Sequence, residues 1–199
     1  MATTMVDWKR KLALAAGRLQ SSEQYLSKID GETGDGDHGV SIGKIAGLMK
    51  VAAESDAVTS EQLFGDLSWK ITNVQGGSVG PLWGTFFEGF ETAFGEDPEA
   101  NVFAVYCSGL ESLQMISRAR CGDKTLMDAL IPAVESLHAE NDDNTNLQKA
   151  AEAAEKGAQA TRDMVAKFGR AKNYGEATIG HLDPGACSMA ILLRAFAED

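Results

Sequence analysis

An acidic, glycine-rich segment offers the clearest chemistry in this sequence. Asp30-Gly-Glu-Thr-Gly-Asp35-Gly-Asp37-His38-Gly39 places four carboxylates in a short loop that runs into a helical segment. Carboxylates this close repel one another, and hard divalent cations with oxygen ligands are the usual compensation. The segment therefore predicts a magnesium-like ion, with a solvated acidic turn as the alternative. The interspersed glycines favour the ion, because they let the backbone fold tightly around a ligand.

Two other interpretations of this loop are excluded. Gly34-x-Gly36-x-x-Gly39 has the spacing of a dinucleotide-binding fingerprint. However, no apolar strand precedes it, and its aspartates would repel a pyrophosphate. An EF-hand calcium loop needs a glutamate at its twelfth position, and counting from any of the three aspartates reaches none.

Two further loops carry groups that suit a phosphate ligand. Residues 75–82, Gln-Gly-Gly-Ser-Val-Gly-Pro-Leu, form a glycine-rich turn before a helical segment. Backbone N–H groups and the helix dipole attract anions at such a position. The loop over residues 169–186 contains Arg170 and Lys172, and arginine offers phosphate a bidentate fork. An ordinary turn and a solvated basic pair are the respective alternatives, and His38 and His181 are more ambiguous because a lone histidine is usually structural.

Helical patterns connect these loops. Apolar residues recur at helical spacing almost everywhere, as in Leu82, Phe86, Phe90 and Phe94. The pattern predicts helices over residues 5–28, 39–54, 60–74, 81–94, 99–118, 125–140, 146–168 and 184–197. Clusters of glycine, aspartate and asparagine separate them, and no long linker or internal repeat divides the chain. We therefore expect an all-α bundle in a single domain over residues 1–199.

The composition limits the classes of function. The chain has 199 residues, 44% of them hydrophobic, and a formal net charge of -11. This charge disfavours nucleic acid and anionic membrane surfaces as partners, because both reward clustered basic residues. No apolar run is long enough for a membrane span, and residues 1–10 lack a targeting pattern. Three scattered cysteines predict neither disulfides nor a zinc site, so we expect a cytoplasmic protein.

Four blocks of sequence resemble the nucleotide-binding L subunit of dihydroxyacetone kinase. They are Gly34-Asp-Gly-Asp-His-Gly39, Gly76-Gly-Ser-Val-Gly-Pro-Leu-Trp-Gly-Thr-Phe-Phe87, Gly122-Asp-Lys-Thr-Leu-Met-Asp-Ala-Leu-Ile-Pro132, and Gly169-Arg-Ala with Gly180-His-Leu-Asp-Pro-Gly-Ala186. They span nearly the whole chain in the family's order, which is far more specific than any one block. The resemblance implies a barrel of about eight antiparallel helices that binds ADP or ATP at one end, with two magnesium ions bridging the phosphates.

The resemblance also implies roles for individual residues. The family's metal ligands match Asp30, Asp35 and Asp37. Its nucleotide-binding positions match His38, Gly39, Ser41, Gly77, Ser78, Val79, Leu126, Arg170, Asp183, Pro184 and Gly185. The sequence departs from the family at Ser41, where asparagine is common, at Val79, where serine is common, and in a shortened loop before Gly122. The catalytic residue is left unassigned, because phosphoryl transfer needs positioning and charge neutralisation more than a covalent protein nucleophile.

Partners follow from the same resemblance. In this family a separate K subunit or domain binds the ketose, so the chain is expected to be a phosphoryl-transfer subunit of glycerone kinase that is inactive without that partner. In members linked to the phosphotransferase system, a phosphohistidine-carrying M subunit recharges a bound nucleotide; in other members ATP exchanges freely. Two alternatives stay open. One is a kinase module for another ketose or a carrier-bound acyl group, and the other is a nucleotide-loaded protein that docks on a transcription regulator.

Overall fold

A computed structural model describes residues 3–75 and 77–198 of the chain. Its α-helices are α1 (Met5–Ser21), α2 (Glu23–Asp30), α3 (His38–Ala53), α4 (Ser60–Thr72), α5 (Val79–Glu96), α6 (Val102–Ile116), α7 (Met127–Glu135), α8 (Asp143–Ala160) and α9 (Pro184–Phe196). Two 3₁₀ segments follow α8, at Thr161–Asp163 and Ala171–Thr178. Within these residues no strand occurs, so the predicted all-α fold is confirmed. None of the described helices is both long and apolar enough to cross a membrane.

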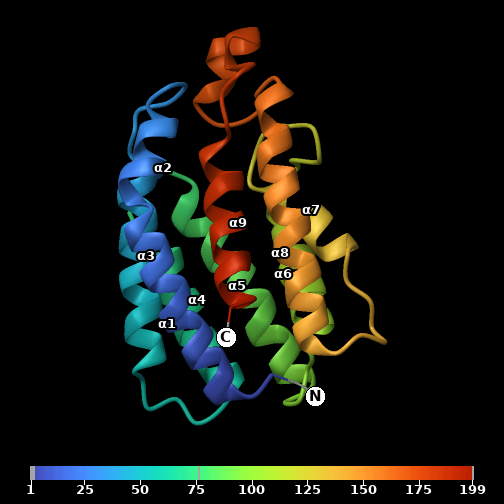
Figure 1. Ribbon diagram of the computed structural model, residues 1–199. Coiled ribbons are helices and arrows are strands. Elements are labelled where there is room, and N and C mark those ends of the chain that lie inside the picture. Colours follow the sequence, from blue (N-terminus) through green and yellow to red (C-terminus); the bar gives the residue numbers. More distant parts are fainter. Residues whose placement is uncertain (1–2, 76, 199) are drawn as a thin grey trace.

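The helices close into a ring (Figure 1). α1 packs on α3, and the contacts continue through α4, α5, α6, α7 and α8 to α9, which packs back on α1. The shorter helix α2 continues from α1 and shares its neighbours α3 and α9, so the two helices together occupy one place in the ring. Among the described residues the ring therefore has eight places, as the resemblance implied.

Aromatic side chains fix the helices to one another inside the ring. Trp8 of α1 lies edge-on to Phe64 of α4 and Phe196 of α9, with ring centroids 5.5 and 5.6 Å apart. Phe64 also contacts Phe90 of α5 at 5.0 Å. All four side chains are fully buried. Burial of each contributes roughly 2–3 kcal/mol, so the core gives the loops at the ends of the helices a rigid base.

The prediction of one helix over residues 5–28 is wrong, because the helix is interrupted at Ser22. The hydroxyl groups of Ser21 and Ser22 both donate to the carbonyl oxygen of Arg18, at 2.9 Å each. Such side-chain bonds to the preceding turn compete with the helical ladder. A new helix, α2, then begins at Glu23 and ends at Asp30.

Two other predicted helices are too long at their C-terminal ends. The helix predicted over 146–168 begins earlier, at Asp143, and ends at Ala160. Thr161 turns the chain there, because its hydroxyl donates to the carbonyl oxygen of Ala158 at 2.6 Å. The helix predicted over 125–140 ends at Glu135. The short 3₁₀ segment over residues 171–178 was not predicted.

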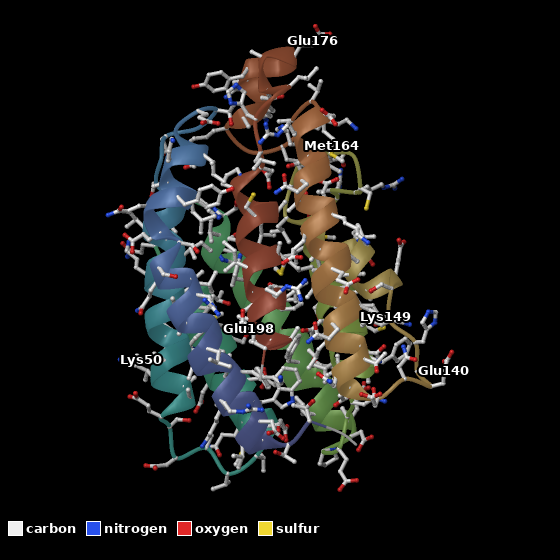
Figure 2. All side chains as sticks on the ribbon, viewed as in Figure 1. Lys50, Glu140, Lys149, Met164, Glu176 and Glu198 are labelled. Carbon is white, nitrogen blue, oxygen red and sulfur yellow. The ribbon has the colours of Figure 1, made fainter. Side chains whose placement is uncertain are left out.

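The loops with the predicted site residues gather at one end of the ring. In Figure 1 the loop after α2, the segment before α7 and the loop between α8 and α9 all lie at the upper end. Figure 2 shows Glu176 and Met164 of the last of these loops at that end, whereas Glu140 lies well below it. Distant parts of the sequence are thus brought to one place.

Candidate functional site

A cavity of about 430 Å³ lies where these loops meet. Most of the predicted site residues line it: Asp30, Asp35, Asp37, His38, Gly77, Ser78, Val79, Leu126, Arg170, Asp183, Pro184 and Gly185. Gly39 and Ser41 do not. Both are buried in the first turns of α3, where Gly39 faces the backbone of α2 and Ser41 is 3% exposed. The structure thus brings together residues from five separate segments, and their role in binding nucleotide stays a prediction.

The three aspartates form a compact cluster. Each offers a carboxylate oxygen, and these oxygens lie within 4.8 Å of one another. Asp30 ends α2, and its Oδ2 accepts a hydrogen bond of 3.1 Å from the backbone N–H of His38. Burial, with repulsion from Asp35 and Asp30, raises the pKa of Asp37. A cluster of carboxylate oxygens this close together fits a hard divalent cation such as Mg²⁺.

Glycine permits the tight path of the loop around this cluster. A Cβ atom at Gly34 would lie 2.5 Å from Oδ1 of Asp30 and 2.9 Å from its carbonyl oxygen. Gly36 has a φ of +76°, in the left-handed region that disfavours other residues. The loop therefore follows the tight path that its glycines favour, and its folding around a ligand stays a prediction.

One ion pair and one histidine–carboxylate hydrogen bond join this loop to the loop between α8 and α9. Arg170 Nη2 lies 3.0 Å from Asp35 Oδ2. His181 Nδ1 lies 2.8 Å from Glu32 Oε2. Lys172, the other basic residue considered for phosphate contact, is exposed and does not line the cavity. Arg170 is therefore the basic residue that the fold directs to the acidic cluster.

His38 begins α3 beside the aspartates and is 8% exposed. Burial lowers its pKa to about 4, although Asp30 opposes this effect. Its Nε2 shares a hydrogen bond of 2.9 Å with the hydroxyl of Ser188 in α9. The imidazole is therefore neutral at pH 7, and it links the acidic loop to the helix on the opposite wall.

The opposite wall is formed by the start of α9 and the turn before α7. Asp183 caps α9 by accepting a hydrogen bond of 2.6 Å from the N–H of Ala186, and burial raises its pKa to about 7. Gly185 packs against Leu126, because a Cβ at Gly185 would lie 3.4 Å from the Leu126 nitrogen. The sequence predicted no role for the other residues that line the cavity as a whole. These are Thr33, Gly34, Leu82, Trp83, Ser117, Ala119, Lys124, Thr125, Met127, Phe168, Gly169 and Ala171.

The missed residues give the cavity an apolar part. Leu82, Trp83 and Met127 lie in the sequence blocks that carry the resemblance, which was the signal that could have found them. Ser117, Ala119 and Phe168 lie outside those blocks and have no distinguishing pattern. A cavity with carboxylates, an arginine and apolar side chains suits a ligand that combines an anionic group with a flat, weakly polar ring.

Known proteins resemble this chain over nearly its whole length. The sequence pattern of the DAK2 domain matches residues 32–198. The chain is 34% identical over 196 residues to the ADP-binding subunit DhaL of PEP-dependent dihydroxyacetone kinase 1 from Listeria innocua, covering 96% of each protein. It is 32% identical over 206 residues to the ADP-binding subunit DhaL from Escherichia coli, covering 98% of this chain and 95% of that subunit.

Larger kinases contain a similar region. The L-erythrulose 1-kinase of Mycolicibacterium smegmatis is 34% identical over 188 residues, which are 89% of this chain and 32% of that enzyme. The crystal structure of the dihydroxyacetone kinase from C. freundii in complex with AMP-PNP and Mg²⁺ is 28% identical, with a TM-score of 0.79 over 99% of this chain and 34% of that chain. The chain belongs to the DAK2 domain family, and over nearly its whole length it is similar to the DhaL subunits of dihydroxyacetone kinases.

Proposed function

We infer that this chain is the magnesium-dependent, ADP- or ATP-binding subunit of a dihydroxyacetone kinase and passes phosphate to a ketose held by a separate K subunit. The observation that carries this proposal is the cluster of three aspartates in the wall of a cavity of about 430 Å³, with Arg170 directed to it. The relatives named as ADP-binding subunits, and the related kinase crystallised with AMP-PNP and Mg²⁺, support the same ligand.

Each group in the wall has a task in this proposal. Asp30, Asp35 and Asp37 would hold magnesium, two ions by the family pattern, and bound Mg²⁺ neutralises developing charge on a transferring phosphate. Arg170 would take phosphate oxygens in its planar fork. Backbone N–H groups at the start of α5, beside Ser78 and Val79, would supply further donors. The apolar wall near Leu126 would hold the base and exclude water.

The identity of the ketose has two candidates. Relatives named as dihydroxyacetone kinase subunits favour the three-carbon ketose. The similarity to an L-erythrulose 1-kinase favours a four-carbon ketose as the second candidate. The PEP- and PTS-dependent names of the bacterial relatives support a phosphohistidine-carrying M subunit as the donor that recharges a bound ADP.

A reconstituted assay tests this function. The chain is mixed with its cognate K subunit and either ATP or the PEP-driven M subunit, and the phosphorylated ketose is measured for dihydroxyacetone and L-erythrulose. We expect product only when the chain and the K subunit are both present, and only with magnesium. Ketose phosphorylation by the K subunit and donor without this chain would contradict the proposal, as would no product from the complete mixture.

A further inference from the structure

The turn between α6 and α7 contains an unusual lysine. Lys124 has a φ of 59°, and no other non-glycine residue in the described part of the chain has a positive φ. A side chain with a Cβ atom resists this conformation, which persists where the surroundings impose it. Asp128 holds the turn in this conformation. Its carboxylate accepts hydrogen bonds from the N–H of Gly122 at 2.6 Å and from the N–H of Thr125 at 2.7 Å.

The ammonium group of Lys124 is directed inward and bonds to two distant segments. The residue is 2% exposed. Its Nζ donates to the carbonyl oxygen of Thr161 at 2.6 Å and to that of His181 at 2.5 Å. Burial lowers the pKa of Lys124, and the carboxylates of Asp183, Asp128 and Asp163 counter that effect while Arg162 adds to it. Charge-assisted hydrogen bonds of this kind are stronger than neutral ones.

The two acceptors lie at the two ends of the loop that carries Arg170. The base of this loop closes on itself, because the N–H of Gly180 donates to the carbonyl oxygen of Arg162 at 2.7 Å. Thr161 adds a further link, since its hydroxyl accepts a hydrogen bond of 3.0 Å from the N–H of Asp183. The two hydrogen bonds of Lys124 therefore attach both chain segments at the base of the loop to the turn before α7. Arg170 of the same loop extends to Asp35 at the other side of the cavity.

We propose that Lys124 is a positioning residue that holds the Arg170 loop in the place where the guanidinium meets the anionic ligand. The inference rests on the proposed nucleotide-binding function and deepens it. Lys124 acts through Arg170, and its own ammonium is already engaged by two carbonyl groups.

The test needs a variant that removes the Lys124 ammonium and keeps the backbone conformation of the turn. Lys124→Gly removes the ammonium and suits the left-handed backbone, so it is the mildest way to delete the two bonds. Lys167→Met is the matched control. Lys167 bonds to Asp123 of the same turn at 2.6 Å, with the lysine side chain 60% and the aspartate 12% exposed. Lys167→Met removes this bond, but the backbone N–H of Lys167 still donates to the carbonyl oxygen of Asp123 at 3.1 Å, so the loop keeps its place on the turn.

Three measurements test the proposal. Hydrogen exchange should become faster in Lys124→Gly for residues 161–183 while the helical circular dichroism spectrum is retained. The Kd for ADP with Mg²⁺, by calorimetry, should rise about tenfold. In an Arg170→Ala background the same substitution should change that Kd by about threefold or less, since residues that act as a unit are not additive. Lys167→Met should leave both exchange and Kd close to those of the parent.

Several results would overturn the role of Lys124. These are unchanged loop exchange, equal losses of affinity in both backgrounds, or loss of helical structure in Lys124→Gly, which would make the lysine a residue of the general fold. If the parent protein binds no ADP, the proposed function fails instead, and the exchange measurement still decides whether Lys124 holds the loop.

Discussion

The guanidinium of Arg170 lies 3.0 Å from the carboxylate of Asp35, although the two residues belong to loops at opposite ends of the sequence. The two side chains are 58% and 42% exposed, so this ion pair contributes on the order of 1 kcal/mol or less to stability. The importance of the pair lies in where it places the arginine side chain. The pair directs an arginine fork to the carboxylate cluster at which a metal-bound phosphate is expected.

Substitution of Arg170 should therefore affect function more than folding. We expect Arg170→Ala to lower phosphoryl transfer in the reconstituted assay by about tenfold or more, because a hydrogen bond to a charged group is worth roughly 1.5–3 kcal/mol. Arg170→Lys should retain part of the activity, since lysine keeps the charge but not the fork. Lys172→Ala is the control and should resemble the parent. Parent-like transfer in Arg170→Ala would make this arginine an ordinary surface residue.

Two glycines of α3 should respond in opposite ways to alanine. A Cβ at Gly39 would collide with the carbonyl oxygen of Glu23 and with Ser27, whereas nothing lies within 4 Å of a Cβ at Gly47. Gly39→Ala should therefore lower the free energy of unfolding by at least about 2 kcal/mol. Gly47→Ala should raise it by about 0.5–1 kcal/mol through helix propensity. Urea unfolding of both variants measures this, and similar values for the two would refute the close packing of α2 on α3.

Asp183 should make stability depend on pH. Burial raises its folded-state pKa from 3.8 to about 7, so the folded protein keeps a proton that the unfolded chain loses. The stability that the protonated Asp183 contributes is fully present below pH 3.8 and is lost as the pH rises to about 7. The full difference between the folded and unfolded pKa values corresponds to roughly 4 kcal/mol of unfolding free energy. Access of cavity water reduces this effect, so we expect a loss of stability of about 2 kcal/mol.

The comparison with Asp183→Asn isolates this effect, because asparagine also caps a helix but does not titrate. Urea unfolding at pH 4 and pH 8 should show the asparagine variant gaining stability relative to the parent at the higher pH. A difference between the two proteins that stays constant from pH 4 to pH 8 would contradict the raised pKa.

Bound nucleotide should stabilise the protein strongly. A ligand that binds only the folded state adds RT ln(1 + [L]/Kd), about 4 kcal/mol at a thousandfold excess over Kd. ADP and Mg²⁺ together should raise the melting temperature, and EDTA should cancel the rise. Equal melting temperatures with ADP in the presence and absence of EDTA would exclude a metal bridge between the aspartates and the nucleotide.

The sequence predicts the parts of this site that have local signatures. Carboxylates between glycines, glycines before a helix and an arginine in a loop all reveal their chemistry within a few residues, and the cavity wall contains most of them. The anchoring by Lys124 could not be predicted, because its partners Thr161 and His181 are close only in the folded chain. The resemblance matches Gly39 and Ser41 to nucleotide-binding positions, and that role stays a prediction. Whether a residue faces the cavity or the next helix depends on packing that one sequence does not specify.

The helix boundaries show the same limit. Apolar spacing continues across Ser22, so the pattern favours one long helix, and the bonds of two serine hydroxyls to Arg18 decide otherwise. The end of α8 at Ala160 similarly depends on a hydroxyl bond made by Thr161. Single side-chain bonds of this kind compete with the helix on nearly equal terms, which is why periodicity alone does not locate such ends.

Calorimetric titration of ADP into the protein with Mg²⁺ tests the central claim most directly. The parent should bind ADP in a saturable, magnesium-dependent manner, and Asp35→Ala and Asp37→Ala should each abolish measurable binding while keeping the helical circular dichroism spectrum. Removing one carboxylate relieves repulsion within the cluster, so loss of binding in a folded variant reports loss of the metal site. Parent-like affinity in both variants, or affinity in the parent that EDTA does not change, would contradict the assignment of Asp30, Asp35 and Asp37 as the magnesium ligands of a nucleotide site.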